Sequence, residues 1–136
     1  MDELIKSMKV SASGMKAQGT RLRVISENLA NADSLPERPG ETPYRRKVIL
    51  FENMLDRELK ASIVKVDKTT VDRSDFPRRY EPSHPAADAE GYVLTPNVNS
   101  LIEVMDMREA ERSYEANLNA IKTSKEMITR AIGLLR

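Results

Sequence analysis

His84, the only histidine, is the side chain of this sequence best suited to acid–base or metal chemistry. It lies in the proline-rich segment Glu81-Pro-Ser-His-Pro-Ala. Nucleophilic catalysis needs a base oriented by a third group, and nothing in the sequence suggests such a set around His84. Zinc prefers cysteine and histidine, and the chain has one histidine and no cysteine. We therefore expect His84 to be structural or solvated, and we expect no catalytic residue, metal site or cofactor.

The other charged clusters are equally poor candidates for chemistry. Asp67, Asp72 and Asp75 do not follow the spacing of a calcium-binding loop. The short basic runs Arg45-Arg46-Lys47 and Arg78-Arg79 lack interleaved aromatic residues, which indicates strand edges or protein-facing patches. With 22 basic and 21 acidic residues, the net charge of +1 gives no reason to expect a nucleic acid or an anionic membrane as partner. We expect neither an enzyme nor a protein that takes a small-molecule substrate.

The strongest pattern is a heptad repeat near the N-terminus, in and around residues 11–32. One series recurs every seven residues and a second is offset from it by four and three. On a helix this spacing forms one narrow stripe that must meet another helix. The spacing alone favours an ordinary bundle helix. The stripe consists of Leu4, Met8, Ser11, Met15, Gln18, Leu22, Ile25 and Leu29.

A second heptad stretch, residues 104–135, is the expected packing partner of the first. Its stripe consists of Val104, Met107, Glu111, Tyr114, Leu118, Ile121, Lys125, Ile128, Ile132 and Leu135. No proline interrupts either stretch. The fold class we expect is mainly α with a small β insert, in which long N- and C-terminal helices form an antiparallel coiled-coil pair. We expect the apolar members of both stripes to form the assembly interface of the protein.

The residues between the helices differ in composition and mark an insert. All seven prolines and five of the six aromatic residues fall within residues 34–96. We expect a terminal-helix domain made of residues 1–33 and 97–136, with 34–96 as a β-rich and loop insert. Strands are expected at residues 44–51, 63–71 and 91–94, and residues 52–60 suit a short helical turn. Asn97, or Ser100 with Glu103, is the expected cap of the second helix.

Several segments carry a resemblance to a known family. Ser11-Ala-Ser-Gly-Met15 with the segment Ile25-Ser-Glu-Asn-Leu-Ala-Asn-Ala32 resembles the N-terminal signature of bacterial flagellar rod and hook proteins. Arg112-Ser-Tyr-Glu-Ala-Asn117 is similar to the C-terminal helix of that family. The segments Tyr80-Glu-Pro-Ser-His-Pro85 and Pro96-Asn-Val-Asn99, with Gly91-Tyr-Val93, narrow the resemblance to the proximal rod. The match runs over nearly the whole chain.

The resemblance implies a structural role in the flagellar basal body. Subunits of this family pack their terminal helices into an inner helical tube, and the chain between the helices faces outward. The rod crosses the periplasmic space and transmits torque from the membrane ring to the hook. The implied partners are copies of the chain, other rod proteins, the membrane-ring and rod-adaptor proteins and the flagellar type III export apparatus. We expect no cleaved signal peptide, because residues 1–10 mix acidic residues and lysines with apolar ones, and export by that route agrees with this expectation.

The sequence alone also supports an alternative function. Apolar residues such as Ile5, Val24 and Met127 lie off the expected stripes, so each helix needs neighbours on more than one side. A helical assembly with non-closing contacts supplies such neighbours. A closed homodimeric four-helix bundle supplies them equally well. A soluble helical-bundle adaptor or signalling module is therefore the alternative to an axial structural subunit.

Overall fold

The computed structural model describes all 136 residues and confirms a mainly α chain with a small β insert. The two helices are α1 (Asp2–Ala30) and α2 (Ser100–Leu134). Between them lie β1 (Lys47–Asp56), β2 (Ala61–Val71), β3 (Arg78–Tyr80) and β4 (Tyr92–Leu94). Neither helix is long and apolar enough to cross a membrane.

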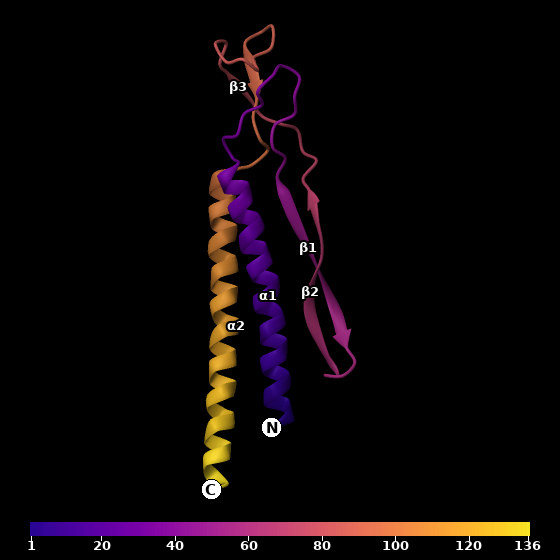
Figure 1. Ribbon diagram of the computed structural model, residues 1–136, viewed down its shortest axis with the longest axis vertical. Coiled ribbons are helices and arrows are strands. Elements are labelled where there is room, and N and C mark those ends of the chain that lie inside the picture. Colours follow the sequence, from indigo (N-terminus) through magenta and orange to yellow (C-terminus); the bar gives the residue numbers. More distant parts are fainter. The chain divides into compact units, whose positions relative to one another are not determined.

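The two helices run antiparallel and pack side by side (Figure 1). A Cβ atom added to Gly14 would lie 2.9 Å from the side-chain nitrogen of Asn117. The side chains of Arg21 and Glu109 form an ion pair at 3.5 Å. From Gly14 to Arg21 along α1, the contacting residue on α2 goes back from Asn117 to Glu109, so the two helices are antiparallel.

Small residues are among the most buried along this contact. Ala110 is 0% exposed, Ser124 is 6% exposed and Ser11 is 8% exposed. Small side chains let two helices approach closely, because the distance between axes depends on the residues at the contact. The tightest line of α2 therefore includes Ala110, Asn117 and Ser124, which are seven residues apart. The expected companion series that includes Leu118 lies one residue further along the chain.

The first two strands form a two-stranded sheet. β1 extends through Asp56, so the helical turn expected at residues 52–60 is wrong for its first half. Residues 57–60 form the turn to β2. The Asp56 carboxylate accepts hydrogen bonds from the backbone N–H groups of Glu58 and Leu59, at 3.0 and 3.1 Å. An aspartate that bonds the backbone two residues ahead favours a turn over a helix, which explains the difference.

The last two strands form a second small sheet, with β3 antiparallel to β4. Gly91 precedes β4 and has a φ of +89°, a conformation that glycine adopts at low cost. The ring of Tyr80 lies 2.9 Å from the position of a Cβ atom at Gly91. A side chain there would be strained in both backbone and packing, so Gly91 is required for this turn.

The start of α2 is capped by Asn99, so both expected caps are wrong. The Asn99 side-chain oxygen accepts the N–H groups of Leu101 and Ile102 at 3.1 and 3.4 Å, as a helix cap does. Asn97 instead accepts the backbone N–H of Arg46 at 2.7 Å. Ser100 is the first helical residue.

The chain divides into two compact units, which we describe separately. The first contains residues 1–22, 49–68 and 108–136, and the second contains residues 23–48 and 69–107. Within the first unit, the β1–β2 turn lies near the start of α1, since Glu58 and Leu59 line a shallow hollow with Asp2, Ile5 and Lys6. The second unit holds the β3–β4 sheet.

Candidate functional site

A buried polar cluster, which we call the clamp, joins three segments of the second unit. Its centre is Asn28 on α1, which is 1% exposed. The Asn28 side chain accepts the N–H of Lys47 and donates to the carbonyl of Lys47, both at 2.9 Å. It also accepts the Tyr44 hydroxyl at 2.7 Å and donates to Glu103 at 3.3 Å. One side chain thereby ties α1 to α2 and to the beginning of β1.

Arg46 completes the clamp from the side of β1. Its guanidinium donates to the carboxylate of Glu103, whose side chain is 1% exposed. The same guanidinium lies 3.6 Å from Asp72 and 3.6 Å from Asp106. A buried carboxylate is stable only when it is paired and hydrogen-bonded. Arg46 and Asn28 satisfy this condition for Glu103.

Hydrogen bonds and neighbouring charges favour the ionised forms of Arg46, Lys47 and Glu27 around the clamp. Burial alone would lower the pKa of Arg46, but the hydrogen bond and the charge of Glu103 raise it. The hydrogen bond between Lys47 and Glu27, 2.9 Å long, raises the pKa of Lys47 and lowers that of Glu27. Burial raises the pKa of Tyr44. The clamp therefore joins charged and polar side chains whose hydrogen bonds hold three segments together.

The first unit shows that α1 presents three different faces. Gly14 and Arg21 face α2, as their contacts with Asn117 and Glu109 show. Successive residues of a helix are turned by about 100°, so residues one before and one after these lie on opposite flanks. Ser13 and Thr20, one residue before, line a cavity of about 440 Å³ beneath the β1–β2 hairpin. The hairpin contributes Met54, Ile63, Val64, Lys65 and Val66 to this cavity.

The opposite flank of α1 is apolar. Met15 and Leu22 follow Gly14 and Arg21 by one residue, so they lie away from the hairpin, and both are half-buried. On α2, Leu118 follows Asn117 in the same way. In an antiparallel pair of right-handed helices, residues one after the contact line lie on the same side of the pair. Within the first unit, the stripe residues Met15, Leu22, Leu118 and Ile121 therefore form one face of the helix pair, which we call the apolar face.

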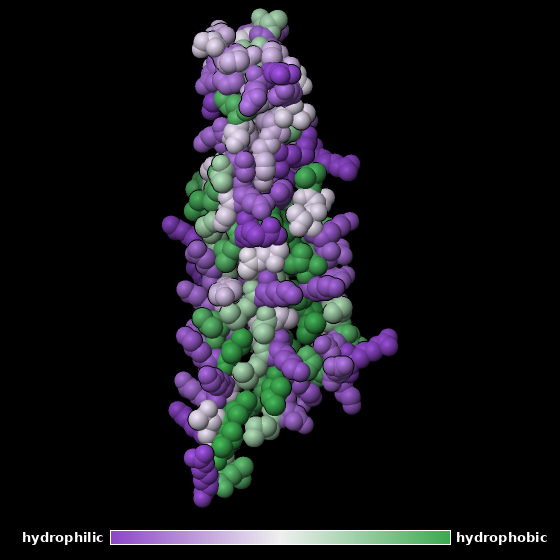
Figure 2. All heavy atoms as spheres, in the orientation of Figure 1, coloured by the Kyte–Doolittle hydropathy of each residue, from purple (hydrophilic) through white to green (hydrophobic).

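The structure places the fourteen expected interface residues as follows. Ile25 is buried, and Val104, Ile132 and Leu135 are 37%, 46% and 83% exposed. The others are half-buried: Leu4, Met8, Met15, Leu22, Leu29, Met107, Tyr114, Leu118, Ile121 and Ile128. Hydrophobic atoms also reach the surface between charged side chains in Figure 2.

His84 has a local structural contact. The ring nitrogen Nδ1 of His84 accepts a hydrogen bond from the backbone N–H of Ala86 at 3.0 Å. The backbone N–H of His84 donates to the carbonyl of Glu81 at 3.0 Å. These bonds stabilise the turn between Pro82 and Pro85. The described residues contain no group of three or more potential metal ligands.

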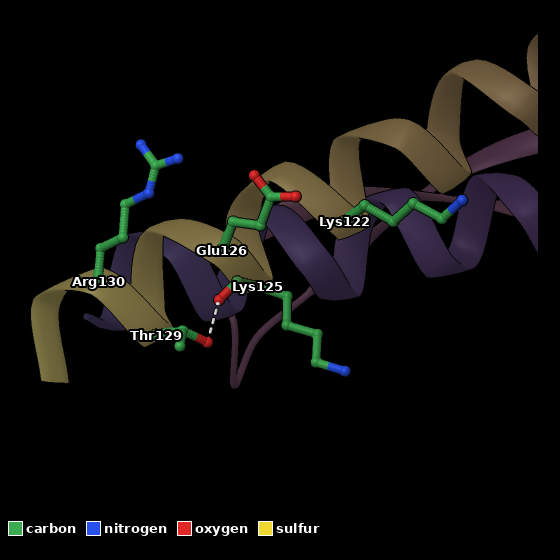
Figure 3. A pocket seen from close by; sticks show the side chains of 5 residues that line it. All are labelled: Lys122, Lys125, Glu126, Thr129 and Arg130. Carbon is green, nitrogen blue, oxygen red and sulfur yellow. Dashed lines mark hydrogen bonds between the residues drawn. The ribbon is translucent and has the colours of Figure 1, made fainter. Parts of the chain in front are cut away.

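The hollows on the surface do not resemble catalytic sites. One of about 380 Å³ is lined by residues of α2 alone: Lys122, Lys125, Glu126, Thr129 and Arg130 (Figure 3). The only hydrogen bond drawn there joins the Thr129 hydroxyl to the backbone carbonyl of Lys125 at 2.9 Å. No nucleophile is paired with a base, so this is a charged helix surface.

Sequence reasoning missed the members of the clamp. The sequence places Asn28 in a family signature, Glu103 in a possible capping box and Arg46 in a basic run, and none of these patterns predicts a buried cluster. One signal was present: Asn28 and Glu103 each directly precede an apolar stripe residue, so each belongs near a buried face. Their pairing depends on contacts between distant segments, which helical spacing does not reveal.

Comparison with known proteins agrees with the family resemblance. Residues 89–134 match the family described as flagellar basal body rod FlgEFG protein, C-terminal, and residues 8–34 match flagella basal body rod protein. The flagellar basal-body rod protein FlgC of Agrobacterium fabrum is 49% identical over 136 residues, covering 100% of this chain and 98% of that protein. FlgC of Bacillus subtilis is 42% identical over 141 residues, covering 93% and 94%. FlgC of Salmonella typhimurium is 37% identical over 133 residues, covering 96% and 97%.

Proposed function

This chain belongs to the FlgC family of flagellar basal-body rod proteins, and we propose that it builds the proximal rod by packing the apolar face of its helix pair against neighbouring subunits. It is a structural subunit of the flagellar basal-body rod and not an enzyme. The expectations of family, fold class and function from the sequence are confirmed. The adaptor alternative is set aside by this membership.

The observation that carries the proposed mechanism is the exposure of the apolar face in a single chain. The β1–β2 hairpin covers one side of α1, while Met15 and Leu22 lie on the other. Val104 and Ile132 on α2 are 37% and 46% exposed. Burying apolar surface contributes about 25 cal/mol per Å², so an uncovered apolar face favours contact with another subunit. Heterologous contacts of this kind extend into a helical assembly when they do not close.

The clamp suits a part that must transmit torque. It joins α1, α2 and β1 through hydrogen bonds in which the buried Asn28 side chain donates and accepts and the buried Glu103 carboxylate accepts. A fully satisfied buried polar network rigidifies its surroundings and specifies one arrangement. We propose that the clamp keeps the helices and the insert in one geometry under load, as torque passes from the membrane ring to the hook.

Membership of the FlgC family also suggests how the chain is arranged in the rod. The chain assembles with other rod subunits. We propose that residues 1–33 and 97–136 form the inner tube and that residues 34–96 face outward. We further propose contacts with the membrane-ring and rod-adaptor proteins at the proximal end. Export through the flagellar type III apparatus, without a cleaved signal peptide, is part of the same proposal.

Deletion of the gene tests the function. Cells without this chain should be non-motile, and images of their envelopes should show membrane rings without a rod. Expression of the intact chain in the same cells should restore both rods and swimming. Normal flagella in the deletion strain would refute a role in the rod.

Charge placed on the apolar face tests the mechanism. Leu22→Asp and Ile121→Asp each put an unpaired carboxylate at a half-buried position, so each should abolish rod assembly and swimming. Glu115→Asp is the control, because this exposed residue lies on the outer side of α2. Wild-type swimming by both Leu22→Asp and Ile121→Asp would show that the apolar face is not the assembly interface.

A further inference from the structure

The cavity of about 440 Å³ beneath the β1–β2 hairpin, which we call the hairpin cavity, lies entirely within the first unit. Its α1 wall contains Ala17, which is 2% exposed, and its hairpin wall contains the half-buried Ile63 and Val66. Met54 and Val64 also line it and are each 38% exposed, so the cavity opens to the surface. An apolar cavity of about 150 Å³ holds a benzene-sized group, so the hairpin cavity has room for about two or three apolar side chains.

Two lysines are the only charged residues that line the hairpin cavity. Lys16 comes from α1 and Lys65 comes from β2, so each wall contributes one ammonium group. Both lysines are exposed, and neither forms a salt bridge within the chain. The hydroxyls of Ser13 and Thr20 donate to backbone carbonyls of α1, at 2.7 and 3.1 Å. The cavity therefore offers a partner apolar surface and two positive charges.

The hairpin cavity runs along the edge of β2. Successive side chains of a strand point to opposite faces of the sheet, but the four consecutive residues 63–66 all line the cavity. The strand β1 is the only partner of β2 in its sheet, and it contributes only Met54 to the cavity. The cavity therefore lies at the edge of β2 that faces away from β1. Backbone N–H and C=O groups at such an edge have no strand to pair with, and they can accept an extended segment of another chain.

We propose that the hairpin cavity binds an extended, acidic segment of a neighbouring rod subunit. The segment places apolar side chains in the cavity, pairs its backbone with the edge of β2 and sets two carboxylates against Lys16 and Lys65. In strand addition of this kind, backbone hydrogen bonds supply affinity, while pockets and charges select the partner. The proposal rests on the proposed rod function and adds a second contact surface, on the flank of α1 opposite the apolar face. Because the two lysines belong to different elements, the bound segment ties the hairpin to α1.

The acyl chain of a lipid is the other kind of molecule that an apolar cavity with a basic rim could hold. A lipid presents one head group to the rim, so it would pair poorly with two lysines that stand on different walls. It also offers no backbone groups to the edge of β2. These two features favour a peptide segment, and the experiment below distinguishes it from a lipid.

Photo-cross-linking in swimming cells identifies what the hairpin cavity binds. Val64 is replaced by the photoreactive residue p-benzoylphenylalanine in the full chain, which is expressed in the deletion strain, and the cross-linked product is sequenced by mass spectrometry. The product should be a segment of a rod protein with two carboxylates within about six residues of the cross-link, which is about 20 Å of extended chain. A segment without carboxylates, a product that is extracted with lipid, or no product in cells that swim would overturn the proposal.

A matched control places the same photoreactive residue elsewhere on β2. Val71 has the same side chain as Val64 and similar exposure, at 41% against 38%, but it does not line the hairpin cavity. Its replacement should not give the acidic product. An equal yield of that product from both positions would show that the contact is not specific to the cavity and would overturn the proposal.

Charge reversal gives an independent readout. Lys16→Glu/Lys65→Glu should reduce the fraction of flagellated cells by about tenfold or more, because like charges then face each other across the contact. Lys9→Glu/Lys68→Glu makes the same change at exposed positions of the same two elements outside the cavity, and it should leave that fraction unchanged.

Reversal of the two carboxylates in the cross-linked segment should restore flagella to Lys16→Glu/Lys65→Glu cells, which a folding defect would not allow. Normal flagella in Lys16→Glu/Lys65→Glu cells, an equal loss in the control, or no rescue would overturn the proposal and leave the rod function intact. Failure of the rod function itself would appear separately, as flagella in the deletion strain.

Discussion

The Asn28 amide donates a hydrogen bond to the Glu103 carboxylate at 3.3 Å, although the two residues are 75 positions apart. Both residues are almost fully buried, at 1% and 0% exposed. A polar pair in this position fixes one residue of α1 opposite one residue of α2. A purely apolar contact would tolerate a shift of register, whereas a shift here would leave a buried carboxylate without partners.

Replacement of Asn28 by leucine should destabilise the second unit strongly. The change removes bonds to Glu103, to the Tyr44 hydroxyl and to both backbone groups of Lys47. Leaving buried polar groups unsatisfied costs about 1–3 kcal/mol each, so we expect a loss of at least about 3 kcal/mol in the free energy of unfolding. Urea denaturation measures it. Asn119→Leu, at an exposed position of α2, is the control and should change stability by less than about 0.5 kcal/mol.

Arg46 and Glu103 should behave as a coupled pair. Arg46→Met leaves the Glu103 carboxylate buried without its cation, and breaking a buried pair in this way costs about 3–5 kcal/mol. Adding Glu103→Met removes the stranded charge and should recover part of that loss. A double-mutant cycle by thermal or urea unfolding gives the coupling energy. Additive effects of the two substitutions would show that the pair is not coupled.

The secondary structure was largely predictable, because it depends on local spacing. The heptad stretches predicted both helices, the β-branched residues near Ile63 predicted β2, and the prolines marked the insert. The prediction failed where a side chain acts on the backbone. The Asp56 carboxylate makes a turn at residues 57–60, and Asn99 caps α2 in place of Asn97 or Ser100.

The residues at the closest helix contact were harder to predict than the apolar residues beside them. Heptad reasoning selects large apolar residues, and it selected Met15, Leu22 and Leu118. The closest contacts instead use Gly14 with Asn117, and Ala110. Which of two adjacent series faces the partner helix depends on how closely the axes approach, and this is a property of the pair and not of either sequence stretch.

Acid should destabilise the second unit partly through Asp72. The Asp72 carboxylate accepts the Ser74 N–H at 2.8 Å, and this bond, together with the Ser74 hydroxyl and Arg46, lowers the pKa of Asp72. A carboxyl whose pKa is lowered on folding contributes stability that is present above its unfolded pKa of about 3.9 and is lost as the pH falls through the folded value. The free energy of unfolding should therefore decrease on acidification below about pH 5. Asp72→Asn should show a smaller decrease over this range, and identical pH profiles would contradict the assignment.

Gly14 and Gly19 offer a matched test of the close approach between α1 and α2. Both lie within α1, but a Cβ atom at Gly14 would meet three atoms of Asn117 at 2.9–3.1 Å, while one at Gly19 would meet nothing within 4 Å. Gly14→Val should therefore force Asn117 or the helix to move, at a cost of about 1–3 kcal/mol. Gly19→Val should leave the stability unchanged or raise it by a few tenths of a kcal/mol, since valine has the higher helix propensity. Urea denaturation of both variants gives the comparison, and because the helical propensity term is the same in both, any difference reports the contact with Asn117. Equal stability of the two variants would show that the helices do not approach as closely at Gly14 as the structure indicates.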